Sequence, residues 1–121
     1  MAMRSLGYCY LNGMGVEKDY NKAFELFKQS AEGGYLDGIT ALGYCYDNGI
    51  GINIDKQKAF ELYQKSANLG SMVAQHNLAN MYENGEGIIK DIDKAIYWYE
   101  KSANQGNQNA QNKLEILRKN K

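Results

Sequence analysis

The sequence predicts an all-α fold, an α-α superhelix (solenoid) of about three and a half helix-turn-helix repeats with a 36-residue period. Two observations predict it. Residues 6–10, Leu-Gly-Tyr-Cys-Tyr, return unchanged at 42–46, and 42 − 6 = 36. Within each period the apolar residues follow helical spacing, as at Ala59, Leu62, Tyr63 and Ala67. Helical units that recur in strict phase meet their neighbours in the same way, so we expect stacked hairpins.

The glycine motif between the helices keeps the same phase. An Asn-Gly-x-Gly sequence begins at Asn12, Asn48 and Asn84 in a chain with 13 glycines and no proline. Such a motif beside a helix start could also cradle a phosphate. However, no Lys-Ser/Thr pair follows it and no strand precedes it, as a P-loop requires. We therefore interpret the three motifs as hairpin turns.

Cap residues mark where each helix begins and ends. Asp19, Asp55 and Asp91 share one phase and suit the N-cap, where a carboxylate accepts unpaired backbone N–H groups. Together with the glycines they predict seven helices, near 1–11, 19–32, 37–47, 55–68, 73–83, 91–104 and 108–119. We assign one domain over 1–121, with repeats at 1–36, 37–72 and 73–108. The polar last helix, 109–121, is the cap that an open solenoid end needs in water.

Composition narrows the class of partner. The 14 basic and 14 acidic side chains cancel, which removes the general attraction for phosphate backbones, so we expect no nucleic-acid partner. No apolar run approaches the roughly 20 residues that span a bilayer, so we expect no membrane partner. Cys9 and Cys45 are one period apart and are interpreted as packed, reduced thiols. A cytoplasmic location is expected, although a chain that begins after a cleaved signal peptide would start in the same way.

The third repeat carries the fullest match to a known family, in its Gly85-x-Gly87 turn, Asp91, Lys94-Ala95 pair and Trp98-Tyr99 pair. These residues resemble the Sel-one-like repeat (SLR), a branch of the tetratricopeptide-repeat (TPR) superfamily. Departures such as Gly38 in place of the first alanine are small or apolar and preserve the hairpin. The resemblance implies a protein-interaction module with adaptor, scaffold or signalling roles and no cofactor.

The resemblance also implies a partner-binding surface. In the TPR superfamily, the solvent-facing side of each repeat's first helix lines a concave groove for a peptide or a partner helix. Here Leu42, Cys45 and Tyr46 define the opposite, inward side. The predicted partner-binding positions are Arg4, Tyr8, Leu11, Asn12, Asp37, Thr40, Tyr44, Asp47, Asn48, Val73, His76, Asn80, Glu83, Asn84, Asn112 and Ile116. Tyr8 and Tyr44 are the preferred anchors; the alternative is that they are ordinary surface tyrosines.

Two other functions stay open beside partner binding. Some SLR proteins have been described as hydrolases of β-lactams, but this chain has no Ser-x-x-Lys motif. Its one histidine, His76, is predicted on the exposed side of its helix without a nucleophile or metal ligands around it, so we assign no catalytic or metal-binding residue. The other alternative is end-to-end self-association, because the first helix has no cap.

Overall fold

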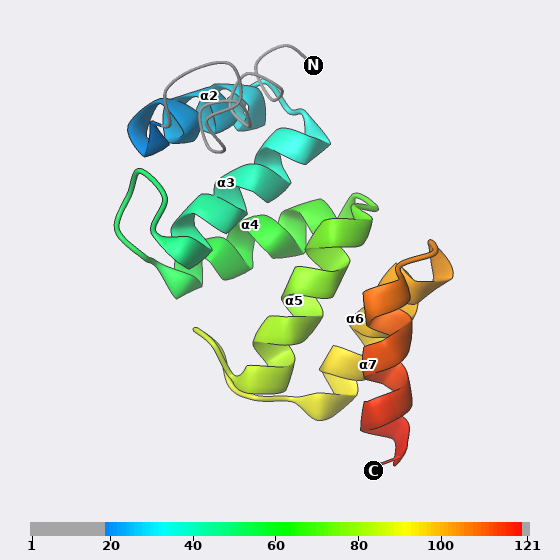
Figure 1. Ribbon diagram of the computed structural model, residues 1–121. Coiled ribbons are helices and arrows are strands. Elements are labelled where there is room, and N and C mark those ends of the chain that lie inside the picture. Colours follow the sequence, from blue (N-terminus) through cyan, green and yellow to red (C-terminus); the bar gives the residue numbers. More distant parts are fainter. Residues whose placement is uncertain (1–18, 120–121) are drawn as a thin grey trace. The chain divides into compact units, whose positions relative to one another are not determined.

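The computed structural model describes residues 19–119, and this range contains six helices and no strand (Figure 1). The helices are α2 (Tyr20–Glu32), α3 (Leu36–Asn48), α4 (Lys56–Asn68), α5 (Met72–Asn84), α6 (Ile92–Asn104) and α7 (Gln108–Lys119). Each begins and ends within one residue of its predicted bounds. The all-α prediction is confirmed, and the helix predicted over 1–11 lies outside the described residues.

The predicted caps are present at the helix starts. The Asp19, Asp55 and Asp91 carboxylates each accept a hydrogen bond from the backbone N–H three residues later, at 3.0, 3.0 and 3.1 Å. At the other end, α3 and α5 stop at Gly49 and Gly85, whose φ angles of 71° and 68° place them in the left-handed region. Glycine adopts this conformation without the steric cost of a Cβ, which explains why the turn motif recurs.

The Asp91 cap gives a direct test of this local structure. We expect Asp91→Ala to lower the free energy of unfolding by about 1 kcal/mol, because the Lys94 N–H loses its acceptor. Asp91→Asn should retain most of the stability, since asparagine caps about as well as aspartate. Urea denaturation followed by circular dichroism measures both. Equal midpoints for the alanine and asparagine variants would contradict the cap.

The chain divides into two compact units, 1–62 and 63–121, with the boundary inside α4. The single domain expected over 1–121 stays a prediction. In the first unit α2 packs on α3, and the ring of Phe24 meets that of Tyr46 edge to face at 5.8 Å. The buried cluster around this contact comprises Ala23, Phe24, Phe27, Ala41, Leu42, Cys45 and Ile50. The aromatic rings from α2 and the apolar side of α3 thus make one core.

Cys45 lies in this core with no exposed surface. Burial raises the pKa of its thiol to about 12, because the thiolate would lose its hydration. The predicted packed position of Cys45 is confirmed; Cys9 lies outside the described residues.

The helices of the first unit approach closely at Gly38. A Cβ at this position would lie 2.3 Å from Ser30 Oγ and 2.8 Å from the backbone nitrogen of Ala31. The corresponding residues one and two periods later are alanines, Ala74 and Ala110. The missing side chain therefore lets the start of α3 pass against the end of α2.

In the second unit α6 packs on both α5 and α7. Polar groups at the end of α6 join it to the start of α5: Ser102 Oγ donates to the Met72 carbonyl at 2.8 Å, and Gln105 Nε2 donates to the Gly70 carbonyl at 3.0 Å. Buried residues of this unit include Tyr63, Leu78, Met81, Tyr99 and Leu114. Across the described range 19–119, no helix has the length and apolar character needed to cross a membrane.

Candidate partner-binding face

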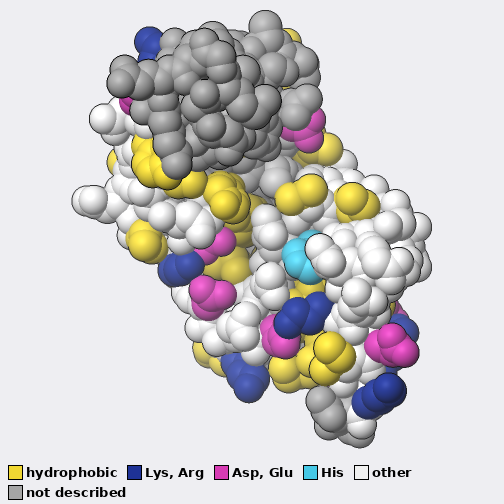
Figure 2. All heavy atoms as spheres, in the orientation of Figure 1, with side chains coloured by type: hydrophobic (Ala, Val, Ile, Leu, Met, Phe, Trp, Pro, Cys, Tyr) yellow, Lys and Arg dark blue, Asp and Glu magenta, His cyan; other side chains and the backbone are white. Residues whose placement is uncertain are grey.

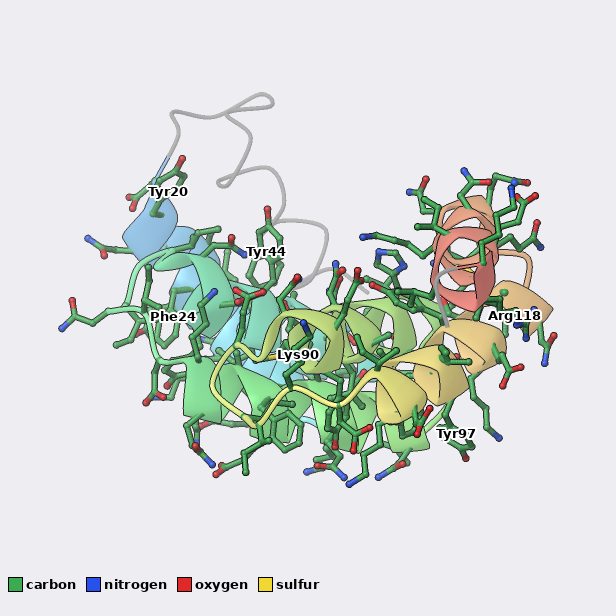
Figure 3. All side chains as sticks on the ribbon, turned by 90° about the horizontal axis from the view of Figure 1, so that it is seen from below. Tyr20, Phe24, Tyr44, Lys90, Tyr97 and Arg118 are labelled. Carbon is green, nitrogen blue, oxygen red and sulfur yellow. The ribbon has the colours of Figure 1, made fainter. Side chains whose placement is uncertain are left out.

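On α3 the structure exposes three of the five predicted partner-binding residues, Asp37, Tyr44 and Asn48. The Tyr44 ring is 45% exposed and projects away from the helix (Figure 3). Asn48 donates from Nδ2 to the Tyr44 carbonyl at 3.1 Å, which holds the amide against the backbone of its own helix. The predicted residues Arg4, Tyr8, Leu11 and Asn12 lie outside the described residues, so the pairing of Tyr8 with Tyr44 stays a prediction.

Two predicted residues of α3 are placed differently from the expectation of a free surface position. Thr40 is only 8% exposed, and its hydroxyl donates to the Leu36 carbonyl one turn earlier at 3.1 Å. A short side chain satisfied by its own helix offers little to a partner. Asp47 is partly buried, and its carboxylate and carbonyl both accept from Lys56 Nζ at the start of α4. Helical spacing gives the side of the helix on which a residue lies, but it shows neither the bond of Thr40 to its own helix nor the approach of Lys56 from α4 to Asp47.

In the second unit, the predicted residues at both ends of α5 and along α7 reach the surface. Val73 is 53% exposed and Ile116 is 55% exposed. Asn84 and Asn112 are also exposed, and Asn112 accepts from Gln108 Nε2 at 3.1 Å. On α7, Asn112 and Ile116 are one helical turn apart, and such a pair is suited to binding a peptide, because the amide can pair with its backbone while the apolar group takes a side chain.

The middle of α5 carries a polar cluster that includes two more predicted residues. The hydroxyl of Tyr99, from α6, lies 2.6 Å from Asn80 Oδ1 and 2.7 Å from Glu83 Oε1, so its proton is shared between two acceptors. Lys113, from α7, donates from Nζ to the Glu83 carboxylate at 3.3 and 3.4 Å. The Glu83 side chain is 18% exposed and that of Lys113 is 39% exposed. The cluster therefore ties three helices together below a partly open surface.

His76, predicted on the exposed side of its helix, is only partly exposed. Its ring packs on Tyr99 with centroids 5.4 Å apart, and its Nδ1 is buried with no hydrogen-bond partner among the described residues. Burial lowers the pKa of His76, as does the positive charge of Lys113, while Glu83 acts in the opposite direction. The imidazole is therefore neutral near pH 7. Figure 2 shows this side chain at the surface, surrounded mostly by polar groups and backbone.

The chemistry of this cluster suits a structural link between helices rather than a catalytic centre. Tyr99 has no exposed surface, and burial followed by its hydrogen bond to Glu83 raises the pKa of the phenol well above its usual range. A buried neutral phenol is a poor nucleophile. Within residues 19–119, no group of three His, Cys, Asp or Glu side chains is placed to share a metal ion.

Lys113 and Tyr99 are the residues of this cluster that sequence reasoning did not assign to the face. A signal for Tyr99 was present, because a tyrosine in the repeated core needs a partner for its hydroxyl and Asn80 and Glu83 share one side of the preceding helix. No comparable signal identified Lys113, whose position follows from how α7 packs on α6.

Comparisons with known proteins agree with the helical repeats. The sequence model for the Sel1 repeat matches residues 1–35, 36–71 and 73–107. The crystal structure of a Sel1 repeat protein from Oxalobacter formigenes is similar, with a TM-score of 0.82 and 39% identity over 95% of this chain and 86% of that one. A protective antigen of uropathogenic Escherichia coli strains that displays an SLR fold gives a TM-score of 0.90 and 33% identity over 96% of this chain. This chain spans 25% of that antigen.

Cysteine-rich protein B of Helicobacter pylori shares the fold, with a TM-score of 0.76 and 23% identity over 92% of this chain and 86% of that one. Among curated proteins compared by sequence, none matches. Sel1 repeat proteins are generally protein-interaction modules and typically non-enzymatic scaffolds. Three matched repeats, and a helical-repeat solenoid fold shared with solved SLR proteins, show that the chain belongs to the Sel1 repeat family.

Proposed function

We propose that the chain is an adaptor or scaffold that binds peptides or partner helices, at the exposed face of α3 in the first unit and at the exposed faces of α5 and α7 in the second. The contrast between repeated and non-repeated positions supports this. One buried position is leucine in each of α3, α5 and α7: Leu42, Leu78 and Leu114. Two residues later the side chains differ and reach the surface in whole or in part: Tyr44, Asn80 and Ile116. A constant buried leucine beneath surface positions that vary is expected when the surface recognises a partner.

The chemistry of these faces favours a polar peptide with a few apolar side chains. Tyr44 offers a rigid ring with a hydroxyl tip in the first unit, and Val73 and Ile116 offer apolar contacts in the second. Exposed Asn84 and Asn112 can bond to peptide backbone groups. The balanced charge of the chain favours such a protein partner over a nucleic acid.

A displayed peptide library tests this proposal, because it offers many combinations of polar and apolar side chains to the proposed faces at once. Peptides selected on the intact chain are synthesised, and their Kd values are measured by fluorescence polarisation. We expect Tyr44→Ala to weaken binding of peptides that contact α3 by about tenfold, as for an aromatic anchor. Ile116→Ala should do the same for peptides that contact α7.

Tyr20→Ala is the matched control, because Tyr20 is 44% exposed but lies on α2, outside the proposed faces. Its binding should equal that of the unmodified chain. If every selected peptide binds the Tyr44→Ala and Ile116→Ala variants as tightly as the unmodified chain, the proposed faces are wrong. Circular dichroism confirms that each variant remains helical.

A further inference from the structure

A groove between α6 and α7 lies outside the proposed partner-binding faces. It has a volume of about 870 Å³, and its lining includes Tyr97, Lys101, Ala103, Gln111, Leu114 and Arg118. Ala103 and Leu114 are buried, whereas Tyr97 is 49% exposed. In Figure 3, Tyr97 is labelled on α6 and Arg118 on α7. The groove therefore combines an apolar floor with an aromatic and charged rim.

One repeat earlier, the equivalent site on α5 is occupied by α6. The contacts of α6 with α5 therefore show how a helix docks at such a site. Three acceptors at the start of α5 receive it: the carbonyls of Gly70 and Met72 and the side-chain oxygen of Gln75. The donors are Ser102 Oγ and Gln105 Nε2, which are three residues apart at the end of α6. Ser102, a small residue, and the amide of Gln105 three positions later thus supply the hydrogen bonds by which α6 docks on α5.

The residues 36 positions after these acceptors are Gly106, Gln108 and Gln111, of which Gln111 lines the α6–α7 groove. The decisive group is Gln111, whose Nε2 donates to the Ala103 carbonyl at 3.3 Å. Gln75 makes the equivalent bond to the Ala67 carbonyl at 3.2 Å while its Oε1 accepts from Gln105. The same bond orients both amides, so Gln111 Oε1 is placed to accept a donor from a docked helix.

The end of the groove near Arg118 differs in charge from the corresponding part of α5, where α6 docks. Lys94 of α6 lies 5.6 Å from the ring centroid of Tyr82, and the residue 36 positions after Tyr82 is Arg118. A lysine on a docked helix would be repelled there, whereas an acidic side chain would be attracted. Arg118 already pairs with Glu100, but their side chains are 55% and 45% exposed, and so exposed a pair contributes little free energy, which a second carboxylate can match. An acidic first turn also suits the positive end of a helix dipole.

The rim supplies an anchor that the earlier repeat lacks. Tyr97 stands one period after Glu61, so an aromatic ring replaces a carboxylate. Trp98 holds this ring edge to face with centroids 5.0 Å apart, and Lys101 Nζ lies 5.3 Å from its centroid. A ring held on two sides while half-exposed loses little freedom on binding, which is the character of an interface anchor.

We propose that the α6–α7 groove binds an amphipathic helix of a partner protein. This helix has an acidic residue in its first turn, facing Arg118, and a small residue followed three positions later by an amide in its last turn, facing Gln111. The helix lies against α7 as α6 lies against α5. The site is independent of the faces proposed above for α3, α5 and α7.

Two peptides built on α6 test the proposal on the full chain. Both span residues 91–106 and are stapled through positions 93 and 97, which are exposed in α6. One keeps Lys94 and the other carries Lys94→Glu, and fluorescence polarisation measures their Kd values. We expect the Lys94→Glu peptide to bind about three- to fivefold more tightly, the size of an exposed ion pair. On an Arg118→Glu chain the order of the two peptides should reverse.

Lys28→Glu is the control for the charge change, because Lys28 is exposed on α2. It should leave both Kd values unchanged. Gln111→Met should weaken both peptides by about threefold or more through loss of the amide acceptor, with the helical content checked by circular dichroism. The proposal is overturned if neither peptide binds, or if Arg118→Glu leaves their order unchanged. It is also overturned if sedimentation shows that a second copy of the chain fills the groove in a dimer that Arg118→Glu dissociates.

Discussion

Replacing Tyr99 by alanine is expected to lower the free energy of unfolding by about 3–5 kcal/mol, the cost of emptying a large aromatic site in a core. Tyr99 has no exposed surface, and its ring contacts His76 while its hydroxyl reaches Asn80 and Glu83. Tyr99→Phe keeps the ring and removes only the hydroxyl. We expect it to cost about 1–3 kcal/mol, because two partly buried acceptors lose their shared donor.

Guanidinium denaturation of both variants separates the packing of the ring from the hydrogen bonds. Tyr97→Phe is the matched control, since it removes a hydroxyl from the same helix at a position that is 49% exposed. The free energy of unfolding of Tyr97→Phe should lie within about 0.5 kcal/mol of that of the unmodified chain. If Tyr99→Phe is as stable as the control, the hydrogen bonds between α5 and α6 do not contribute to stability.

The helices of this chain were predictable because several local signals agree at each boundary. At Asp91, the aspartate phase, the start of apolar spacing and the preceding glycine turn all indicate the same residue, and the carboxylate does accept the Lys94 N–H. The left-handed turns at Gly49 and Gly85 follow from the repeated Asn-Gly sequence in the same way. Each of these features depends on neighbours within a few residues, so one sequence is enough to find it.

The partner-binding face was less predictable because it depends on contacts between helices. Helical spacing placed Thr40, Asn80 and His76 together on the solvent side. The structure instead buries Thr40 and packs His76 on Tyr99. The contacts that cover side chains on this face join residues 16 to 30 positions apart, such as Tyr99 with Glu83 and Lys113 with Glu83. A period identifies equivalent positions, but the side chains that differ between repeats determine which of them are covered.

Gly38→Ala is expected to destabilise the chain by about 1–3 kcal/mol, although the same change at an ordinary helix position stabilises. Alanine favours the helix over glycine by about 1 kcal/mol, so a purely local effect would have the opposite sign. Here the new Cβ would lie 2.3 Å from Ser30 Oγ and 2.6 Å from Ser30 Cβ, and α3 would have to move away from α2. The sign of the change therefore distinguishes the helix crossing from helix propensity.

A double variant identifies the cause. Ser30→Gly removes both Ser30 atoms from the crossing, so Gly38→Ala should cost less in that background than alone. Recovery should be partial, because the backbone nitrogen of Ala31 would still lie 2.8 Å from the new Cβ. Ala74→Gly makes the opposite change at the corresponding position of α5, where an alanine is already accommodated without exposed surface. It should also destabilise, since it removes a buried methyl group and weakens the helix. Stabilisation by Gly38→Ala would show that α2 and α3 are not held together at this crossing, and that the glycine is a replaceable departure from the repeat.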